Sequence, residues 1–486
     1  MDTSLLGLKM RHRSCTWLLF LPFVMHAGAA VDGRPPNVVV FLADDLGATD
    51  LGCFGSKFYE TPHLDRLAAG GMRFSAAYSA CPVCSPTRAS MMTGRYPQRS
   101  DVTNFIGAKQ PDKWDRNTRL LPAPYATRLP LDERTIAEEL HDAGYATFFA
   151  GKWHLGEKGF LPTDQGFDVN KGGTRAGSPK SHLSPFGNPQ LSDGPPGEEL
   201  SLRLADEACQ FITAHADRPF LTCVSLFDVH VPLQAPPRLV EKYKAKVTNL
   251  NIKESWGSER NSKVRLVQSH PIYAGMIETM DTAVGRVLDK LDELQLADDT
   301  IVIFTSDNGG LSTAEGWSTS NLPLRGGKGW LYEGGIRTPT IIRWPGVAQP
   351  GSACATPIIS NDFFPTLLEA AGKKKRQSTS PLDGESIVPL LRGKAIEPRR
   401  LYWDYPHYGN QGGSPASAIR DGHWKLIEWR EDDTAELYDL QSDTGEQHDL
   451  SAQQPDVAKR LRDSLANWRQ EIGAKTPTPN PRYSPN

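Results

Sequence analysis

The most constraining feature of the chain is a short, wholly apolar segment that stops abruptly at two acidic residues. Residues 37–43 read Asn-Val-Val-Val-Phe-Leu-Ala, and Asp44 and Asp45 follow at once. A continuous apolar run rich in β-branched residues is typical of a strand that is buried on both faces, as in a parallel sheet covered by helices. The segment therefore predicts a central strand with a candidate site at its exit.

Strand-like and helix-like segments alternate through most of the chain. Residues 132–140 predict a helix that ends at Gly144, and a second helix is predicted over residues 271–294. Apolar segments rich in β-branched and aromatic residues predict strands at residues 145–150, 219–226 and 300–306. This alternation predicts an α/β fold with a large, mostly parallel central sheet flanked by helices on both faces.

A change of composition near residues 393–400 predicts a domain boundary. Downstream, residues 423–428 read as a short alternating strand and residues 454–472 as a helix, which is typical of a small α+β unit with a short antiparallel sheet. We therefore expect a catalytic α/β domain over residues 31–395 and a C-terminal α+β subdomain over residues 396–486. The proline-rich end is expected to lie along the surface.

The first 30 residues have the pattern of a signal peptide. Basic residues at positions 9, 11 and 13 precede an apolar stretch over residues 17–25 and then the small residues 27–30. The apolar stretch is too short, and too interrupted by Pro22, to span a membrane. We therefore expect a periplasmic or secreted protein with no membrane span.

The net charge limits the partners of the protein. A formal charge of -3 gives no broad attraction to nucleic acid or to an anionic membrane, so an anion site must be built from a few local cations. Seven cysteines are present, one of them inside the predicted signal peptide. Export permits disulfides without requiring them.

Cys84, Pro86 and Arg88 form a Cys-x-Pro-x-Arg run, the recognition signal for oxidising cysteine to formylglycine. The hydrated aldehyde offers a nucleophilic oxygen and a second hydroxyl that can later expel the captured group. A buried, inert cysteine is the competing interpretation. The following residues favour modification, because they predict a short helix that opens just after Pro86, ends at Gly94 and directs its positive end at Cys84. Cys81 is followed by neither the proline nor the arginine, which also weakens a redox or metal-binding interpretation of the Cys-x-x-Cys pair.

Two pairs of polar residues follow apolar strands. Asp44 and Asp45 follow the first predicted strand, and Asp307 and Asn308 follow the strand over residues 300–306. Their oxygens are hard ligands that suit Ca²⁺ or Mg²⁺ better than a softer metal. Adjacent acids are more often simply solvated. Both pairs end apolar strands, where uncompensated charge is costly, and this favours a cation site.

Lysine and histidine side chains follow other strand-like segments. Lys152 and His154 lie two residues apart, and an extended backbone would point both the same way. His230 follows the strand over residues 219–226, and Lys328 lies among glycines that let backbone approach a ligand. A surface lysine, a packed histidine and a structural His230 are the alternatives. The residue order of a phosphate-binding P-loop is absent around Lys328.

These motifs, in their order along the chain, resemble the type I, formylglycine-dependent sulfatases, arylsulfatase-like members of the alkaline phosphatase superfamily. The similarity runs from about Pro36 to Ile472 and includes the Glu-Gly-Gly-Ile-Arg-Thr-Pro segment at residues 333–339. Thr87 stands where serine is commoner, and residues 48–49 stand where an aromatic residue or glycine is often seen. Neither departure removes a catalytic group.

The resemblance implies a set of site residues. One Ca²⁺ ion would be bound by Asp44, Asp45, Asp307, Asn308 and the 3-oxoalanine (formylglycine) derived from Cys84. Arg88 would steady the modified residue. Lys152 and Lys328 would bind the sulfate oxygens, and His154 and His230 would transfer protons. In this hypothesis the hydrated aldehyde attacks sulfur, His230 protonates the leaving oxygen, and His154 acts as base when sulfate departs.

The resemblance predicts a sulfuric ester hydrolase that removes sulfate from a sulfated carbohydrate, with a formylglycine-generating maturation enzyme as a partner. His407, in the aromatic and amide-rich segment 405–413, is a candidate sugar contact, although an ordinary loop is equally consistent with that segment. A galactose-type sugar is a guess from resemblance only. The alternative is a formylglycine-dependent phosphonate monoester or phosphodiester hydrolase. A catalytically silent glycan-binding relative ranks last, because none of the expected groups is missing.

Overall fold

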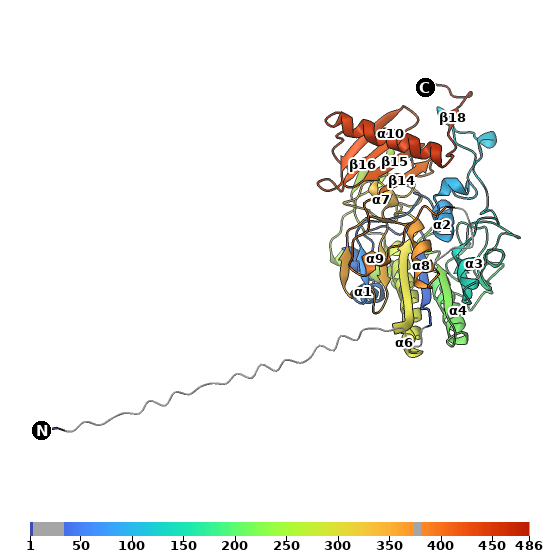
Figure 1. Cartoon of the computed structure of the whole chain (residues 1–486), viewed down its shortest axis with the longest axis vertical. Helices are drawn as coiled ribbons and strands as arrows, with labels where there is room; N and C mark the ends of the chain where they lie inside the picture. Colours follow the sequence, from blue (N-terminus) through green and yellow to red (C-terminus); the bar gives the residue numbers. More distant parts are fainter. Residues whose placement is uncertain (3–33, 374–380, 486) are drawn as a thin grey trace.

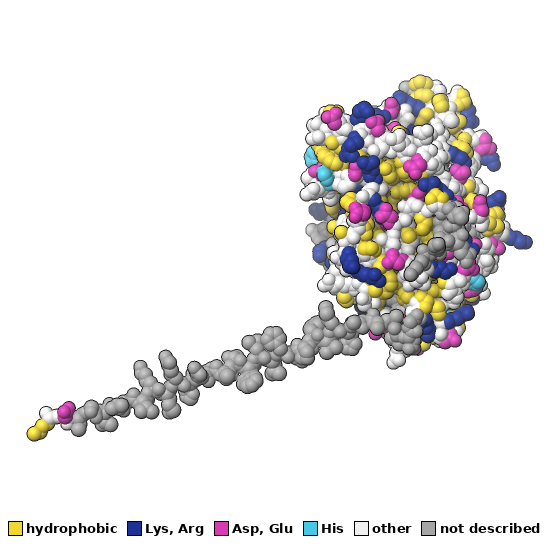
Figure 2. All heavy atoms as spheres, viewed as in Figure 1, with side chains coloured by type: hydrophobic (Ala, Val, Ile, Leu, Met, Phe, Trp, Pro, Cys, Tyr) yellow, Lys and Arg dark blue, Asp and Glu magenta, His cyan; other side chains and the backbone are white. Residues whose placement is uncertain are grey.

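The computed structural model describes residues 1–2, 34–373 and 381–485, so the predicted signal peptide lies almost wholly outside the described residues. Figure 1 shows a large body of strands and helices, with the C-terminal strands β14 to β16 and helix α10 at one end of it. Basic and acidic side chains are interspersed over the face shown in Figure 2, as the small net charge leads one to expect. None of the helices in the described part of the chain has the length and apolar character needed to cross a membrane.

The main sheet has eight strands in the order β12-β2-β11-β10-β1-β7-β5-β6. Its members are β1 (Asn37–Ala43), β2 (Met72–Phe74), β5 (Ala146–Gly151), β6 (Val169–Lys171), β7 (Phe220–Ser225), β10 (Thr300–Ser306), β11 (Thr340–Arg343) and β12 (Ser352–Cys354). Strand β1 runs parallel to both neighbours, β7 and β10, whereas β11 is antiparallel to β10 and β2. The predicted mostly parallel sheet, with the first strand at its centre, is confirmed.

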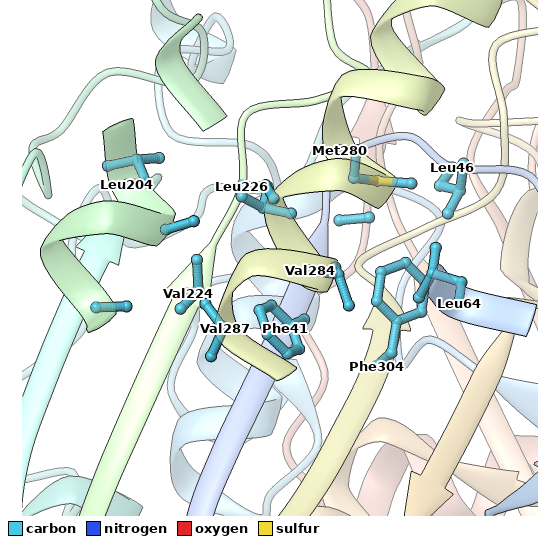
Figure 3. Packing of buried hydrophobic residues seen from close by; sticks show 14 of the residues in the cluster. Phe41, Leu46, Leu64, Leu204, Val224, Leu226, Met280, Val284, Val287 and Phe304 are labelled. Carbon is cyan, nitrogen blue, oxygen red and sulfur yellow. The ribbon is translucent and has the colours of Figure 1, made fainter. Parts of the chain in front are cut away.

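Alternate residues of β1 point to opposite faces of the sheet, and each face has its own core. Phe41 packs with Val224 of β7 and Phe304 of β10 beneath α6, as Figure 3 shows. Leu42 belongs to the core on the other face. Helices α1 (Pro62–Ala69), α4 (Leu200–Ala214), α5 (Pro237–Asn249) and α6 (Pro271–Glu293) contribute to the first core, and α2 (Cys84–Thr93), α3 (Ile136–His141), α8 (Phe363–Ala370) and α9 (Val388–Leu391) to the second. Because both faces are covered, β1 can be apolar throughout.

The C-terminal part is a four-stranded antiparallel sheet covered by one helix. Its strands are β14 (Arg400–Tyr405), β15 (Ala416–Asp421), β16 (Trp424–Trp429) and β17 (Thr434–Asp439), and α10 (Pro455–Glu471) packs on them. This confirms the predicted antiparallel α+β unit, and we propose a boundary near residue 395, just before β14. The shorter elements are β3 (Ala77–Tyr78), β4 (Leu120–Leu121), β8 (Trp256–Glu259), β9 (Ser262–Arg265), α7 (Glu333–Ile336), β13 (Ile358–Ile359) and β18 (Thr478–Pro479). The proline-rich end lies on the surface as β18, paired with β4.

Two helix starts differ from the sequence prediction. Helix α2 begins at Cys84 rather than after Pro86, and the proline is accommodated because the first N–H groups of a helix need no partner inside it. Helix α3 begins at Ile136, several residues later than predicted. The side chain of Thr135 accepts the N–H of Glu138, and the Glu138 side chain accepts the N–H of Thr135, so this capping box fixes the start.

Asp281 of α6 gives a prediction about stability and pH. It is 1% exposed and accepts the N–H groups of His63 and Leu64, in the first turn of α1, at 3.1 and 2.8 Å. Burial raises the pKa of Asp281 to about 7, above its usual value of about 4.

The folded protein therefore binds more protons than the unfolded chain between these two pH values. The stability of wild type relative to Asp281→Asn should fall as pH rises from about 4 to about 7 and then stay constant. Urea unfolding of both proteins across this range measures the difference, and a difference that rises with pH would contradict the assignment.

Candidate active site

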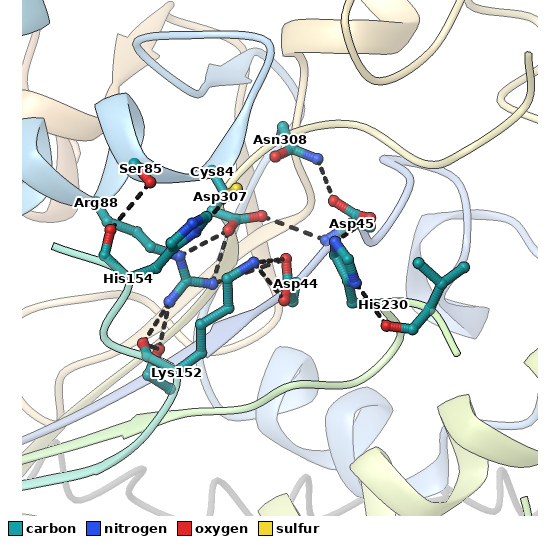
Figure 4. Close-up of polar contacts among 12 residues, drawn as sticks. Asp44, Asp45, Cys84, Ser85, Arg88, Lys152, His154, His230, Asp307 and Asn308 are labelled. Carbon is teal, nitrogen blue, oxygen red and sulfur yellow. Dashed lines mark hydrogen bonds and ion pairs between the residues drawn. The ribbon is translucent and has the colours of Figure 1, made fainter. Parts of the chain in front are cut away.

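Three strands of the main sheet deliver polar side chains to one edge (Figure 4). Asp44 and Asp45 follow β1, Asp307 and Asn308 follow β10, and Lys152 follows β5. Strand β1 is parallel to β10 and β7, and β7 is parallel to β5, so the carboxyl ends of all four point the same way. The structure therefore brings together residues from distant parts of the sequence at the carboxyl edge, where sites on such sheets form.

Two buried lysines are paired with the two aspartates after β1. Lys152 Nζ lies 2.8 and 2.7 Å from the two carboxylate oxygens of Asp44, and neither side chain is exposed. Lys328 Nζ lies 2.9 Å from Oδ2 of Asp45. Burial alone would raise the pKa of Asp45, but Lys328 and His230 more than offset it and hold that pKa below its usual range. These pairs place two ammonium groups and two carboxylates in one buried cluster.

Arg88 joins the helix that carries Cys84 to three strands. Its Nε and Nη2 donate to Oδ2 of Asp307 at 2.8 and 2.6 Å, and its Nη1 donates to the carbonyl of Lys152 at 2.7 Å and to Oγ of Ser225 at 2.6 Å. All three guanidinium nitrogens thus donate hydrogen bonds to groups at the ends of β10, β5 and β7. Sequence reasoning missed Ser225, although a polar residue at the end of a predicted apolar strand was an available signal.

Cys84 is the first residue of α2 and is 3% exposed. Its Sγ lies 3.3 Å from Nδ1 of His154. Burial raises the pKa of the Cys84 thiol, although Lys152 and Lys328 act in the opposite direction. A thiol that stays protonated is a poor nucleophile. The unmodified side chain is therefore ill suited to attack.

His154 lies beside Cys84 in an unusual backbone conformation. The predicted extended backbone through Lys152 and His154 is wrong, because β5 ends at Gly151 and His154 has a φ of 56°. Its Nε2 lies 2.9 Å from the carbonyl of Ile106, so Nε2 carries the proton and Nδ1 accepts from Cys84. Burial, and then Lys152, lower the pKa of His154 well below its usual value. The imidazole is neutral and has its accepting nitrogen toward the cysteine.

His230 follows β7 and lies on the opposite side of Asp45 from Asn308 (Figure 4). Its Nδ1 is 2.8 Å from the carbonyl of Val231, and its Nε2 is 3.6 Å from Oδ2 of Asp45. Because Nδ1 donates to a carbonyl, Nε2 is the nitrogen that faces the acids. Burial and the nearby Lys328 lower the pKa of His230 well below its usual value. An anionic substrate would oppose that shift, because negative charge favours the protonated imidazole.

The donor set at this edge fits a hard divalent cation. Atoms from Asp44, Asp45 and His230 lie within 4.8 Å of one another. Asn308 donates through Nδ2 to Oδ1 of Asp45 at 2.8 Å, and its own Oδ1 is buried without a partner among the described residues. A bound cation would satisfy this amide oxygen, and oxygen ligands favour Ca²⁺ or Mg²⁺.

Asp50 is a supporting residue that sequence reasoning missed. Its side chain is unexposed and accepts the N–H of Gly47 at 3.0 Å, the hydroxyl of Thr319 at 2.8 Å and the hydroxyl of Tyr273 at 2.6 Å. Tyr273 lies 3.5 Å from the carbonyl oxygen of Asp45. Asp50 thus fixes the turn after β1 against α6 and the segment before Lys328. Its short distance along the chain from Asp45 was the only available signal.

Replacing Asp50 with alanine should lower kcat/KM for a sulfate ester by roughly 10-fold to 100-fold, the usual effect of losing a residue that orients metal ligands. The physical reason is that the turn carrying Asp44 and Asp45 loses its anchor. Assays at increasing Ca²⁺ concentrations should show that the variant needs more Ca²⁺ for half-maximal activity, and that Asp50→Asn retains more activity. An unchanged Ca²⁺ requirement in a folded Asp50→Ala protein would contradict the positioning role.

His407 lies apart from this cluster of charges. It is 1% exposed, its Nε2 is 3.0 Å from Oγ1 of Thr103, and its Nδ1 has no partner. Burial lowers the pKa of His407 to about 3. Its ring also contacts those of Tyr125 and Tyr405. A sugar contact by His407 stays a prediction.

Comparisons with known proteins agree along the chain. The family model described as Sulfatase matches residues 36–373, and the model described as N-sulphoglucosamine sulphohydrolase, C-terminal, matches residues 327–471. A sulfatase of Formosa agariphila is 31% identical over 537 residues, covering 94% of this chain and 93% of that protein. The N-acetylgalactosamine-6-sulfatase of Canis lupus familiaris is 31% identical over 427 residues, covering 83% of this chain and 73% of the relative. The crystal structure of Ps i-CgsB in complex with k-i-k-neocarrahexaose aligns with a TM-score of 0.73 at 26% identity, covering 90% of this chain and 93% of that chain.

Proposed function

Since the chain belongs to the sulfatase family and is therefore a sulfuric ester hydrolase, we propose that it removes sulfate from a sulfated carbohydrate. The observation that carries the proposal is that Lys152 and Lys328, paired with Asp44 and Asp45, lie close enough to the buried Cys84 to oppose the rise that burial causes in the pKa of its thiol. The ammonium groups neutralise sulfate oxygens, and the cysteine is the position of the nucleophile. We further propose that the protein acts outside the cytoplasm, on the basis of the signal-peptide pattern alone.

The sulfate pocket is completed by two groups that the chain acquires. Formylglycine made from Cys84 would supply a hydrated aldehyde as nucleophile, and a Ca²⁺ ion held by Asp44, Asp45, Asp307 and Asn308 would supply positive charge beside it. Arg88 keeps Asp307 in place through two hydrogen bonds to its Oδ2 and fixes α2 relative to β10. Lys152 and Lys328 bring the charge that a transferring sulfuryl group requires on its oxygens.

Proton transfer falls to the two histidines in this proposal. His154 presents its accepting Nδ1 to the side chain at position 84, so it can take a proton there as sulfate is expelled. His230 presents Nε2 toward the acids, and once an anionic substrate favours the protonated imidazole, Nε2 can pass a proton to the leaving alcohol oxygen. The two imidazoles thus serve two different steps: His230 acts when the S–O bond to the alcohol breaks, and His154 acts when the C–O bond between residue 84 and the sulfate breaks and the aldehyde reforms.

A carbohydrate is the substrate class that the relatives support best. One relative is named for N-acetylgalactosamine 6-sulfate hydrolysis, and the Ps i-CgsB structure was determined in complex with k-i-k-neocarrahexaose. A phosphonate monoester hydrolase of Agrobacterium radiobacter shares the fold at 22% identity, with a TM-score of 0.63. Phosphorus ester hydrolysis is therefore an outcome that the test must be able to show.

The test compares three esters that all release the same leaving group, 4-nitrophenol. The protein, expressed with a formylglycine-generating enzyme, is assayed on 4-nitrophenyl sulfate, on bis(4-nitrophenyl) phosphate and on 4-nitrophenyl phenylphosphonate, and sulfate release is then followed from monosulfated sugars. Preference for the sulfate ester together with release from a sugar supports the proposal. Faster cleavage of either phosphorus ester, with no sulfate released from any sugar, would move the protein to the alternative function.

A further inference from the structure

The loop after β10 contacts both segments that bear Lys328 and His230. Thr313 of this loop accepts a hydrogen bond from the indole of Trp330, two residues beyond Lys328, at 3.3 Å. Gly316 lies against the segment after His230, because a Cβ built on it would be 3.5 Å from Cδ1 of Leu233. Residues 314–316 therefore lie between the lysine segment and the histidine segment.

Glu315 is the charged residue at this position. It is half-buried, and its carboxylate makes no hydrogen bond or ion pair with any residue in the described part of the chain. Burial lowers the pKa of Lys328, but Asp45 and, to a smaller extent, Glu315 act in the opposite direction, so Glu315 lies near that ammonium. The oxygens of Glu315 are not among the buried side-chain atoms, so solvent or a ligand can reach them.

The backbone around Glu315 is held in a strained conformation. Three successive residues have positive φ: Glu315 (52°), Gly316 (100°) and Trp317 (45°). Trp317 is fixed at both ends, since its carbonyl accepts from Nε of Arg265 at 2.6 Å and its Nε1 donates to the carbonyl of Lys263 at 2.9 Å. Non-glycine residues keep such conformations only where the surrounding structure enforces them. Here the β8–β9 hairpin holds the backbone of residues 315–317 in this conformation and so fixes the position of Glu315.

We propose that Glu315 accepts hydrogen bonds from hydroxyl groups of the sugar that bears the reacting sulfate, and that it disfavours a second anionic group next to that sulfate. The inference rests on the proposed function and names its substrate class more narrowly: a singly sulfated sugar with free neighbouring hydroxyls. Hydroxyl donors satisfy the carboxylate, whereas a second sulfate or a uronate would meet like charge in a partly desolvated site.

The test measures kcat/KM of wild type, Glu315→Ala and Glu315→Gln on a monosulfated sugar, on the same sugar with a second sulfate, and on 4-nitrophenyl sulfate. Glu315→Ala should lose roughly tenfold or more on the monosulfated sugar, as for a lost hydrogen bond to a charged group, and almost nothing on the aryl ester, which has no hydroxyl. Glu315→Gln should raise the ratio of disulfated to monosulfated turnover. Glu241→Gln removes an exposed charge on α5 that pairs with Lys244; it is the matched control and should change neither ratio.

Equal losses on the sugar and the aryl ester would show a merely structural role and overturn the inference. An unchanged ratio in Glu315→Gln would overturn it as well. If the proposed function is wrong, the result is different: wild type itself cleaves the aryl sulfate but releases sulfate from none of the sugars. That result would overturn the proposed function and, with it, the role of Glu315.

Discussion

Replacing Cys84 with alanine is expected to lower sulfate release by about 10⁴-fold or more, the scale on which hydrolases lose activity when their nucleophile is removed. Cys84 is the first residue of α2, and its Sγ lies 3.3 Å from the accepting nitrogen of His154. The loss should appear in kcat for aryl and sugar sulfates alike, because the missing group reacts with sulfur and not with the alcohol.

Cys81→Ala is the matched control for this experiment. Cys81 is equally buried three residues earlier, and alanine keeps the carbonyl that accepts from Ser79 and Thr87. Its activity should remain near that of wild type. An aldehyde-specific hydrazide should label wild type and Cys81→Ala after denaturation and leave Cys84→Ala unlabelled. Turnover by Cys84→Ala within tenfold of wild type would remove this residue from the reaction.

Removing divalent cations is expected to lower turnover by roughly 10²-fold or more, comparable to the loss of a group that stabilises the transition state. The carboxylates of Asp44, Asp45 and Asp307 are unexposed. Burial, the largest cause, raises the pKa of Asp44 well above its usual range, and the neighbouring acids add to that shift. A bound cation would reverse this shift by favouring the ionised acids. Dialysis against a chelator followed by activity assays measures the loss, and added Ca²⁺ should restore turnover.

A readout independent of turnover distinguishes a bound cation from a general salt effect. Thermal unfolding should shift to higher temperature on adding Ca²⁺ to the chelator-treated protein, because a ligand that binds only the folded state stabilises it. The shift should be smaller for Asn308→Ala, whose orphaned oxygen is removed, and unchanged for an exposed-site control such as Glu241→Gln. A shift of the same size in Asn308→Ala would exclude Asn308 as a ligand.

The strands and their polar exits could be predicted because their signal is local. Residues 37–43 are apolar and end in two aspartates, and residues 300–306 repeat that pattern before Asp307. Strand β1 occupies all of the first segment and β10 all of the second. Parallel pairing then places Asp44 near Asp307 without further information.

The features that sequence reasoning did not predict depend on contacts between distant segments of the chain. Ser225 and Asp50 gain their importance from Arg88 and Tyr273, which approach only in the folded chain. The left-handed backbone of His154 has no sequence signal, since that conformation is enforced by its surroundings. His407 lies in a segment for which a sugar contact and an ordinary loop were equally consistent; in the structure its ring is buried against Tyr125 and Tyr405.

The most direct test of the account is sulfate release, measured by ion chromatography, from a panel of monosulfated sugars of defined linkage incubated with the matured protein. The account predicts stoichiometric sulfate and free sugar from at least one member of the panel, and no release by Cys84→Ala. Cleavage of aryl sulfate without sulfate release from any sugar would contradict the carbohydrate assignment, and release by Cys84→Ala at the wild-type rate would contradict the chemistry.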